Sequence, residues 1–158
     1  MKRRNAEGAF TYIFRGGRRS GKTWYIAFNL LRFAYNGSIV NIASMTAEQG
    51  RLGAYADMKS ILKMCPFFGA PDVLEAPREI RFNNGRGGKI FFNSYKNGET
   101  AKGVACDYLY MNEANNFSLQ QYTDLVANVR QGVFIDFNPN VEFWVNDMFT
   151  DEDICDTT

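Results

Sequence analysis

The sequence contains no histidine and only three cysteines. Cys65, Cys106 and Cys155 lie far apart, so their spacing fits no zinc site. An odd number of widely separated cysteines also argues against a framework of disulfide bonds. We therefore expect free thiols, as in a protein of the reducing cytoplasm.

Long hydrophobic runs are absent as well. No uninterrupted apolar stretch approaches the roughly 20 residues that a membrane-spanning helix needs. The basic start, residues 1–4, leads into the polar residues 5–8 rather than into the apolar segment of a signal peptide. The sequence thus predicts a soluble, intracellular protein with no membrane partner.

Charge of one sign is not in excess, because the formal net charge is +1. Any attraction to nucleic acid must therefore come from local clusters of charge rather than from the total. The 46% hydrophobic and 15% aromatic residues argue against disorder. A length of 158 residues is typical of one domain, so residues 1–158 are expected to form a single domain with its own core.

The stretch GGRRSGKT matches the phosphate-binding loop pattern of glycine, four residues and then Gly-Lys-Thr. Its glycines let several backbone N–H groups point into one cavity, which fits a β-phosphate. Lys22 is expected to reach the β- and γ-phosphates, and the hydroxyl of Thr23 to bind Mg²⁺. The nucleotide-binding residues predicted from this loop are Gly16, Gly17, Arg18, Arg19, Ser20, Gly21, Lys22 and Thr23.

The segments on either side of this loop have the order that it requires. Residues 9–14 are apolar and β-prone, and residues 24–34 are apolar at helical spacing. Strand, loop and helix thus follow one another, and the helix N-terminus faces the bound anion.

The rest of the chain alternates between strand and helix patterns. This alternation predicts an α/β fold with a mainly parallel sheet flanked by helices and with an added β-hairpin. Loops are expected at residues 66–77, and a frayed acidic tail from residue 151. The helix after the phosphate loop is expected to end near Asn36 and Gly37, which supply a left-handed cap. Thr46 and Gln49 are expected to open the next helix as a capping box. The expected strands are 38–43, 108–112 and 133–138, the hairpin strands are 79–82 and 89–94, and the expected helices are 46–64 (broken near Gly53), 119–130 and 142–149.

A second motif follows the predicted strand 108–112. Glu113 at its end could orient and deprotonate the water that attacks a γ-phosphate. Asn112 stands where a Mg²⁺-associated acid is usual, and its amide could bind a metal-bound water without contributing charge. Asp107, at the start of the strand, is expected to lie too far away to replace it. The predicted metal-binding residues are therefore Thr23 directly and Asn112 and Glu113 through water.

A third motif, Asp-Phe-Asn-Pro-Asn at residues 136–140, ends the last predicted strand. The side chain of Asn138 could sense the γ-phosphate or the attacking water through hydrogen bonds. Within the phosphate loop, Arg18 or Arg19 could neutralise charge that develops on the γ-phosphate. The predicted catalytic residues are Glu113, Arg18, Lys22 and Asn138.

Together these motifs resemble the ATPase domain of the large terminase subunit of tailed bacteriophages, the motor that packages DNA into procapsids. Arg18 stands where the phosphate loop of that family has its characteristic arginine. Residues 112–115 resemble a variant of the family's acidic motif, and residues 101–103 and 137–145 also match its layout. The resemblance covers residues 10–149 and implies a P-loop NTPase fold of the ASCE type.

The resemblance also implies a function, which is Mg²⁺-dependent ATP hydrolysis that drives double-stranded DNA into viral procapsids. The cofactors would be ATP and Mg²⁺. The partners would be double-stranded DNA, the portal protein, the small terminase subunit and further copies of the chain in a ring. The location would be the host cell cytoplasm, at the procapsid during virion assembly. The C-terminal nuclease domain of such subunits is expected to be absent from residues 1–158.

Two other functions stay open at this point. A P-loop kinase would need an acceptor pocket and usually an arginine-rich lid, whereas residues 98–116 offer only Lys102. A nucleotide-regulated DNA-binding or assembly domain without catalysis is compatible with the uncharged Asn112. The arginine that would act on a neighbouring subunit in the ring is not assigned, and the candidates are Arg78, Arg81, Arg86 and Arg130.

Overall fold

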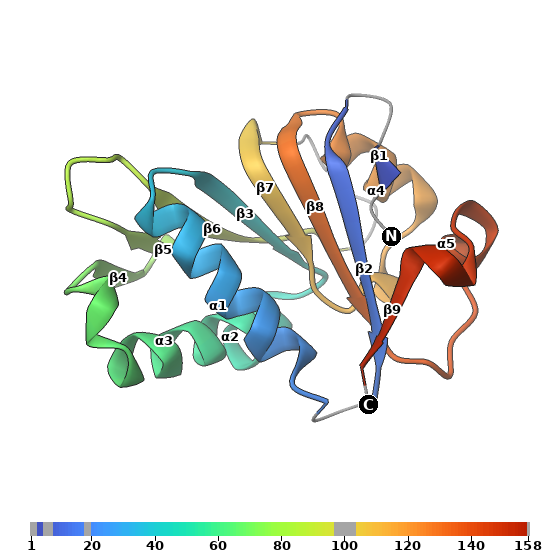
Figure 1. Cartoon of the computed structure of the whole chain (residues 1–158), viewed down its shortest axis with the longest axis horizontal. Helices are drawn as coiled ribbons and strands as arrows, with labels where there is room; N and C mark the ends of the chain where they lie inside the picture. The colour runs from blue at the N-terminus through green and yellow to red at the C-terminus, as the bar shows by residue number, and fades with distance from the viewer. Residues whose placement is uncertain (1–2, 5–7, 18–19, 97–103, 158) are drawn as a thin grey trace.

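The computed structural model describes residues 3–4, 8–17, 20–96 and 104–157, and it has an α/β architecture (Figure 1). Its described strands form one sheet in the order β1-β2-β8-β7-β3-β6-β5-β4, and β9 pairs with β2. The strands are β1 (Arg3–Arg4), β2 (Phe10–Gly16), β3 (Ile39–Ser44), β4 (Asp72–Glu75), β5 (Arg78–Arg81), β6 (Lys89–Ser94), β7 (Cys106–Met111), β8 (Val129–Phe137) and β9 (Ile154–Thr157).

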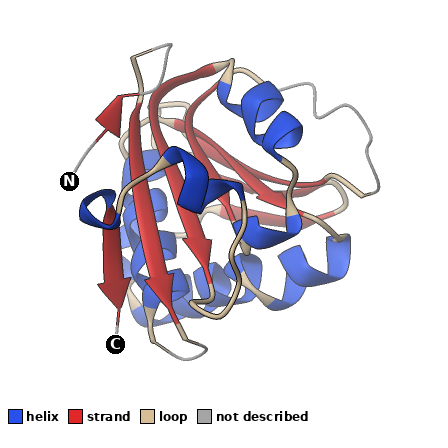
Figure 2. Ribbon diagram, turned by 90° about the vertical axis from the view of Figure 1, so that its right-hand side faces the viewer, coloured by secondary structure: helices blue, strands red, loops and turns tan. Residues whose placement is uncertain are grey.

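Helices cover both faces of this sheet (Figure 2). One face packs against α1 and α3, and the other against α4 and α5, so the hydrophobic core has two layers. The helices are α1 (Lys22–Tyr35), α2 (Ala47–Leu52), α3 (Ala54–Met64), α4 (Leu119–Val126) and α5 (Trp144–Met148), with short 3-10 turns η1 (Pro66–Phe68), η2 (Ala114–Asn116) and η3 (Asp151–Asp153).

The centre of the sheet is parallel. The strands β9, β2, β8, β7, β3 and β6 run in the same direction, whereas β1, β4 and β5 pair antiparallel to their neighbours. Strands that are covered on both faces need continuous apolar residues, and β8 is buried at every position from Gly132 to Phe137. The predicted α/β fold, mainly parallel and flanked by helices, is confirmed.

Several local predictions are also confirmed. Helix α1 ends before Asn36, and Gly37 takes a left-handed φ of 104°. Thr46 begins α2 with a capping box, and Gly53 separates α2 from α3. The predicted hairpin is formed by β5 and β6. The three cysteines are free, as expected.

Three expectations about the elements are wrong. The helix predicted over 119–130 ends at Val126, because Val129 already pairs with Cys106 as the first residue of β8. The predicted loop 66–77 contains η1 and also β4, a short and mostly exposed edge strand that pairs with β5. A strand of this kind lacks the apolar alternation that would reveal it in the sequence.

The acidic tail is ordered rather than frayed. Residues 151–153 form η3, and β9 pairs in parallel with the end of β2. Arg15 on β2 forms ion pairs with Asp151 at 3.0 Å and with Asp156 at 2.6 Å, so charges of opposite sign meet along this edge. The C-terminal strand therefore lies beside the strand that leads into the phosphate loop.

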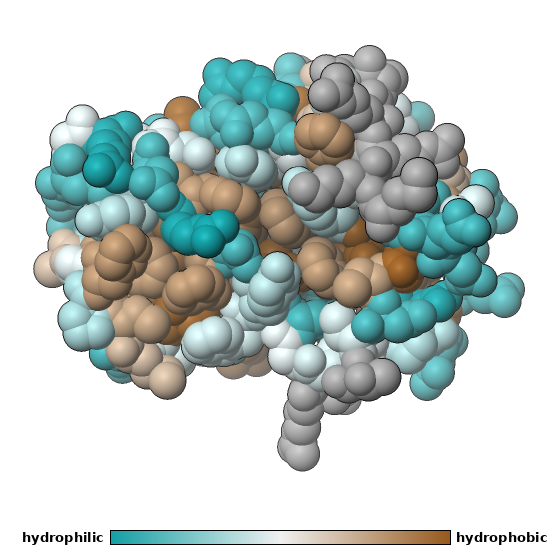
Figure 3. All heavy atoms as spheres, in the orientation of Figure 1, coloured by the Kyte–Doolittle hydropathy of each residue, from teal (hydrophilic) through white to brown (hydrophobic). Residues whose placement is uncertain are grey.

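The surface on the α1 side carries scattered apolar residues, which appear brown in Figure 3. Met64 and Phe67 are exposed apolar residues of the described chain, and the amphipathic Trp24 and Tyr25 at the start of α1 are exposed as well. Trp24 follows the phosphate loop directly and stacks on Phe28 with ring centroids 6.0 Å apart.

Candidate active site

The phosphate loop connects the end of β2 to the start of α1, as predicted. Gly21 precedes α1 with a φ of 78°, a left-handed conformation that favours glycine. The N–H groups of the first turn of α1 point toward the loop, as in any helix, and no side chain of the N-cap residue Gly21 bonds to them. A side chain at Gly16 would overlap Thr157 of β9, so the loop begins where two strands approach closely.

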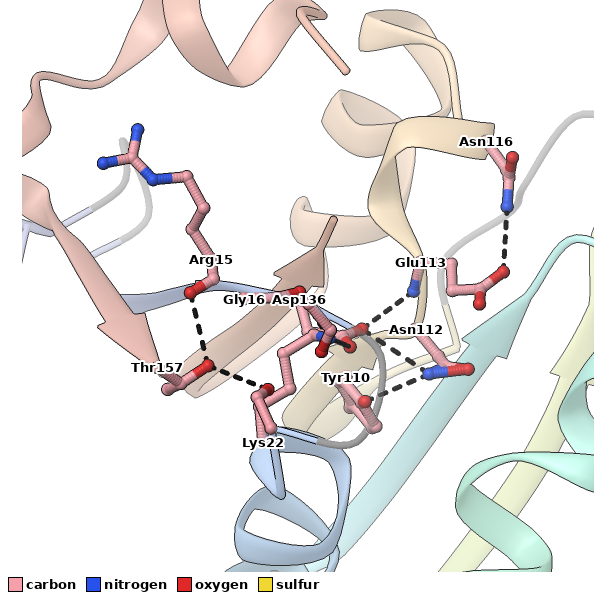
Figure 4. Close-up of polar contacts among 11 residues, drawn as sticks. Arg15, Gly16, Lys22, Tyr110, Asn112, Glu113, Asn116, Asp136 and Thr157 are labelled. Carbon is pink, nitrogen blue, oxygen red and sulfur yellow. Dashed lines mark hydrogen bonds and ion pairs between the residues drawn. The ribbon is translucent and has the colours of Figure 1, made fainter. Parts of the chain in front are cut away.

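Lys22 places its positive charge inside this loop. Its side chain is buried, and its Nζ donates to the carbonyl oxygens of Gly16 at 2.8 Å and Gly17 at 3.2 Å. The same nitrogen lies 3.9 Å from Oδ2 of Asp136 on β8 (Figure 4). The predicted phosphate-binding lysine is thus fixed by three oxygen atoms at the mouth of the loop.

The loop opens into a pocket of about 260 Å³. Residues 20–24 line it from the loop and from α1, and Asp57 lines it from α3. Partial burial raises the pKa of Asp57. Ser20 is also held from behind, because its Oγ and the Oγ1 of Thr157 are 3.1 Å apart.

The second motif lies at the end of β7, close to the loop. Glu113 has φ 54° and ψ 58°, and it is the one non-glycine residue with positive φ in the described part of the chain. Its backbone N–H donates to Oδ1 of Asp136 at 2.8 Å, and its Oε2 accepts from Nδ2 of Asn116 at 3.4 Å. Backbone strain of this kind is typical of functional positions, where surrounding contacts enforce it.

Asn112 is buried beside Glu113. Its Nδ2 donates to the phenol oxygen of Tyr110 at 3.1 Å and reaches Oδ1 of Asp136 at 3.5 Å. A side chain at Gly53 would come within about 3.1 Å of its Oδ1, so the break between α2 and α3 packs directly on this amide. Asn112 and Glu113 line a pocket of about 470 Å³ together with residues 46, 48, 49, 52 and 53.

Asp136 is the site residue whose role the sequence did not reveal. It is 2% exposed, and this burial raises its pKa to about 6 even though the Glu113 N–H and the Lys22 charge favour the ionised form. Burial, together with the negative charge of Asp136, also raises the pKa of Tyr110. A signal was present in the sequence, since residues 133–137 (VFIDF) contain one charged residue within an apolar strand.

The remaining predicted residues fall in different places. Asn138 follows β8 directly and is partly exposed. Asp107 lies at the opposite end of β7 from Asn112, where it accepts from the Ile39 N–H at 2.8 Å and pairs with Arg130 at 3.0 Å. This position agrees with the expectation that Asp107 cannot replace Asn112.

Some predictions fall outside the described residues. Arg18 and Arg19 do, and so does the segment 101–103. The candidates for an arginine that acts on a neighbouring subunit are described, and each has a partner in its own chain. Arg78 donates to the Ala47 carbonyl, Arg81 to Glu79, Arg86 to Asn36 and Arg130 to Asp107.

The chain matches one known protein family over most of its length. The model of the phage terminase large subunit family matches residues 9–158. The chain belongs to this family. A comparison with curated proteins gave no match.

Solved terminases share the fold. A crystal form of the large terminase from a thermophilic bacteriophage aligns with a TM-score of 0.72 at 17% identity, over 92% of this chain and 38% of that one. The same terminase in complex with ADP aligns with a TM-score of 0.66 at 18% identity over 92% and 39%. The large terminase ATPase domain of Thermus phage P74-26 aligns with a TM-score of 0.61 at 16% identity over 88% and 63%. This chain therefore spans about two fifths of the first of these terminases.

Proposed function

We propose that the chain hydrolyses ATP and thereby drives double-stranded DNA into viral procapsids, as the ATPase domain of a terminase large subunit. Family membership supports the biological role. The observation that carries the chemistry is the meeting of Lys22 and the Glu113 backbone on one buried carboxylate, that of Asp136. A phosphate-binding group and a candidate base are thereby held in a fixed relation, which is what positioning for phosphoryl transfer requires.

Different residues of the site bind the phosphates and activate the attacking water. The N–H groups at the start of α1 and the ammonium of Lys22 hold the phosphates and offset their charge. The carboxylate of Glu113, at the edge of the larger pocket, orients a water molecule and accepts its proton as the water oxygen attacks the γ-phosphorus. The bond to the β–γ bridging oxygen breaks, and ADP and phosphate result. Asn138 and Arg18 are proposed to contact the γ-phosphate.

The candidate site offers oxygen atoms of the kind that bind Mg²⁺. Thr23 offers a hydroxyl, Asn112 an amide and Glu113 a carboxylate, and Mg²⁺ takes such oxygen ligands together with water. The Asn112 amide donates to the phenol of Tyr110 at 3.1 Å, and the Thr23 side chain interacts with the same phenol, so both lie beside Tyr110. When bound, Mg²⁺ would neutralise phosphate charge.

The partners are proposed from family membership. They are double-stranded DNA, the portal protein, the small terminase subunit and further copies of this chain in a ring, at the procapsid in the host cytoplasm. Residues 1–158 would act in this assembly as a single ATPase domain. In the part of the chain that the structure describes, no helix has the length and apolar character to cross a bilayer.

Phosphate release from ATP tests the proposal, with and without duplex DNA and over a range of protein concentrations, because a ring partner could contribute to the site. The wild-type chain is compared with Glu113→Gln and with the control Glu75→Gln, an exposed residue on the edge strand β4. We expect DNA-stimulated release in the wild type and in the control, and its loss in Glu113→Gln. Transfer of phosphate to a small acceptor would instead indicate a kinase. Tight ATP binding without turnover at any protein concentration would indicate a regulatory domain.

A further inference from the structure

The candidate site carries no negative charge at position 112, directly after β7. Asn112 is neutral, and its amide nitrogen is committed to the oxygens of Tyr110 and Asp136. An amide at this position cannot balance the positive charge of Lys22. The carboxylate that the structure places 3.9 Å from the Lys22 ammonium comes from another strand.

Asp136 on β8 lies where that charge is needed. Strand β8 lies between β2 and β7, and the pairing of Met111 with Ile135 places Asn112 and Asp136 at the next position of the two strands. Asp136 also pairs in register with Phe14 of β2, two residues before the phosphate loop. Its carboxylate therefore lies between the two motifs, and both reach it.

The two oxygens of this carboxylate have different partners. Oδ2 lies 3.9 Å from Nζ of Lys22, whereas Oδ1 accepts from the Glu113 N–H at 2.8 Å and contacts the Asn112 amide at 3.5 Å (Figure 4). A buried carboxylate is costly unless it is paired and hydrogen-bonded. Asp136 meets both conditions through Lys22, Glu113 and Asn112 of the site and also interacts with the phenol of Tyr110.

We propose that Asp136 is a positioning residue of the ATPase site, which supplies from β8 the negative charge that Asn112 lacks and ties Lys22 to the backbone of Glu113. This inference rests on the proposed function. Asp136 acts through its neighbours and leaves proton transfer to Glu113. The carboxylate thus lies on β8, one strand away from Asn112 and at the same level of the sheet.

The competing explanation is that Asp136 merely accepts hydrogen bonds that hold β7 and β8 together. The variant Asp136→Asn distinguishes the two explanations, because its amide oxygen can still accept from the Glu113 N–H while the negative charge is lost. Asn112→Asp adds a carboxylate on the neighbouring strand, and the double variant moves the charge from β8 to β7. Asp107→Asn is the matched control, since Asp107 also accepts a backbone N–H and pairs with a cation, at the far end of β7.

The first measurement is steady-state phosphate release. We expect Asp136→Asn to lower kcat about 10- to 100-fold, as loss of a residue that orients active-site groups typically does, with KM unchanged or lower. The double variant should recover most of this loss, because it restores one carboxylate between Lys22 and Glu113. Asp107→Asn should turn over at the wild-type rate. Wild-type turnover in Asp136→Asn, or a double variant no better than the single one, would overturn the proposal.

The second measurement is ADP binding in EDTA, which needs neither metal nor turnover. Removing a negative charge next to Lys22 should tighten binding of the diphosphate, and the double variant should return the affinity to the wild-type value. Unchanged or weaker ADP binding in Asp136→Asn would contradict the proposed charge role. If the wild type itself released no phosphate, the proposed function would fail, and this titration would still decide the role of Asp136.

Discussion

Asp136→Asn should remove the pH-dependent contribution that the Asp136 carboxyl makes to the free energy of unfolding. Burial raises the pKa of Asp136 from 3.8 to about 6 in the folded chain, so the folded state holds this proton more tightly than the unfolded state does. The groups that face it are Lys22 from α1, Tyr110 and Asn112 from the end of β7, and Glu113. The neutral carboxyl therefore stabilises the fold below pH 3.8, and this contribution is lost as the pH rises through about 6.

The magnitude follows from the size of the shift. A difference of about two pKa units corresponds to about 3 kcal/mol in the free energy of unfolding. Because Asn carries no titrating group, the stability of Asp136→Asn relative to wild type should rise by up to about 3 kcal/mol between about pH 4 and pH 7. The difference between the two proteins cancels the other carboxyl groups, which titrate in both.

Urea unfolding without nucleotide, followed by far-UV circular dichroism at several pH values, measures this difference. Asp107→Asn serves as a control for the loss of a carboxylate that accepts a backbone N–H elsewhere on β7. A stability difference that stays constant across this pH range would refute the reasoning. So would a difference of opposite sign, since it would mean that pairing with Lys22 outweighs the cost of burial.

Three further changes have expected outcomes of their own. Lys22→Ala should weaken ADP binding about 10- to 100-fold in a fluorescence titration, since it removes a charge-assisted contact to phosphate, and undiminished binding would argue against the predicted role of this lysine. Glu113→Val should lower the free energy of unfolding by about 1–3 kcal/mol, because a β-branched side chain tolerates positive φ poorly. Glu113→Gly should not lower it, and equal effects of the two variants would show that φ at this position does not matter. Gly88→Ala should destabilise the fold by about 1–3 kcal/mol in urea unfolding, because its Cβ would overlap the Ala34 carbonyl at the end of α1, and an unaffected midpoint would contradict that close approach.

Local signals in the sequence were sufficient for much of the fold. The glycine pattern before Lys22 located the first strand, the loop and α1, and the Thr46 capping box with Gly53 located α2 and α3. These features depend on neighbours within a few residues, so composition and spacing reveal them. The parallel sheet followed from the alternation of strands and helices.

Other features depend on contacts between distant residues. Strand β9 forms by pairing in parallel with β2, and Arg15 of β2 also pairs with Asp151 and Asp156 from the far end of the chain. Nothing in an acidic tail indicates that partner. The start of β8 at Val129 is likewise set by pairing with β7, which outweighs the helical pattern before it. Tertiary pairing of this kind routinely overrides local propensity.

The sequence predicted which residues lie at the candidate site better than it predicted the contacts between them. The structure places Lys22 at the start of α1, and Asn112 and Glu113 directly after β7, where the sequence predicted them. Their roles remain predictions, as do those of Arg18 and Arg19, which lie outside the described part of the chain. Asp136 belongs to the third motif, but its role depends on the strand order that places β8 between β2 and β7. That order is a property of the whole sheet.

The most direct test of ATP hydrolysis at this site compares Glu113→Gln with the wild type. ATP binding and phosphate release are measured on the same samples. The account predicts that both proteins bind ATP with similar affinity, because Lys22 and the phosphate loop are unchanged. It also predicts that phosphate release falls at least about 100-fold in the variant, as expected when a general base is lost. Phosphate release at the wild-type rate in Glu113→Gln would contradict the assignment of Glu113 as the general base, and no phosphate release from the wild type would contradict the proposed ATPase.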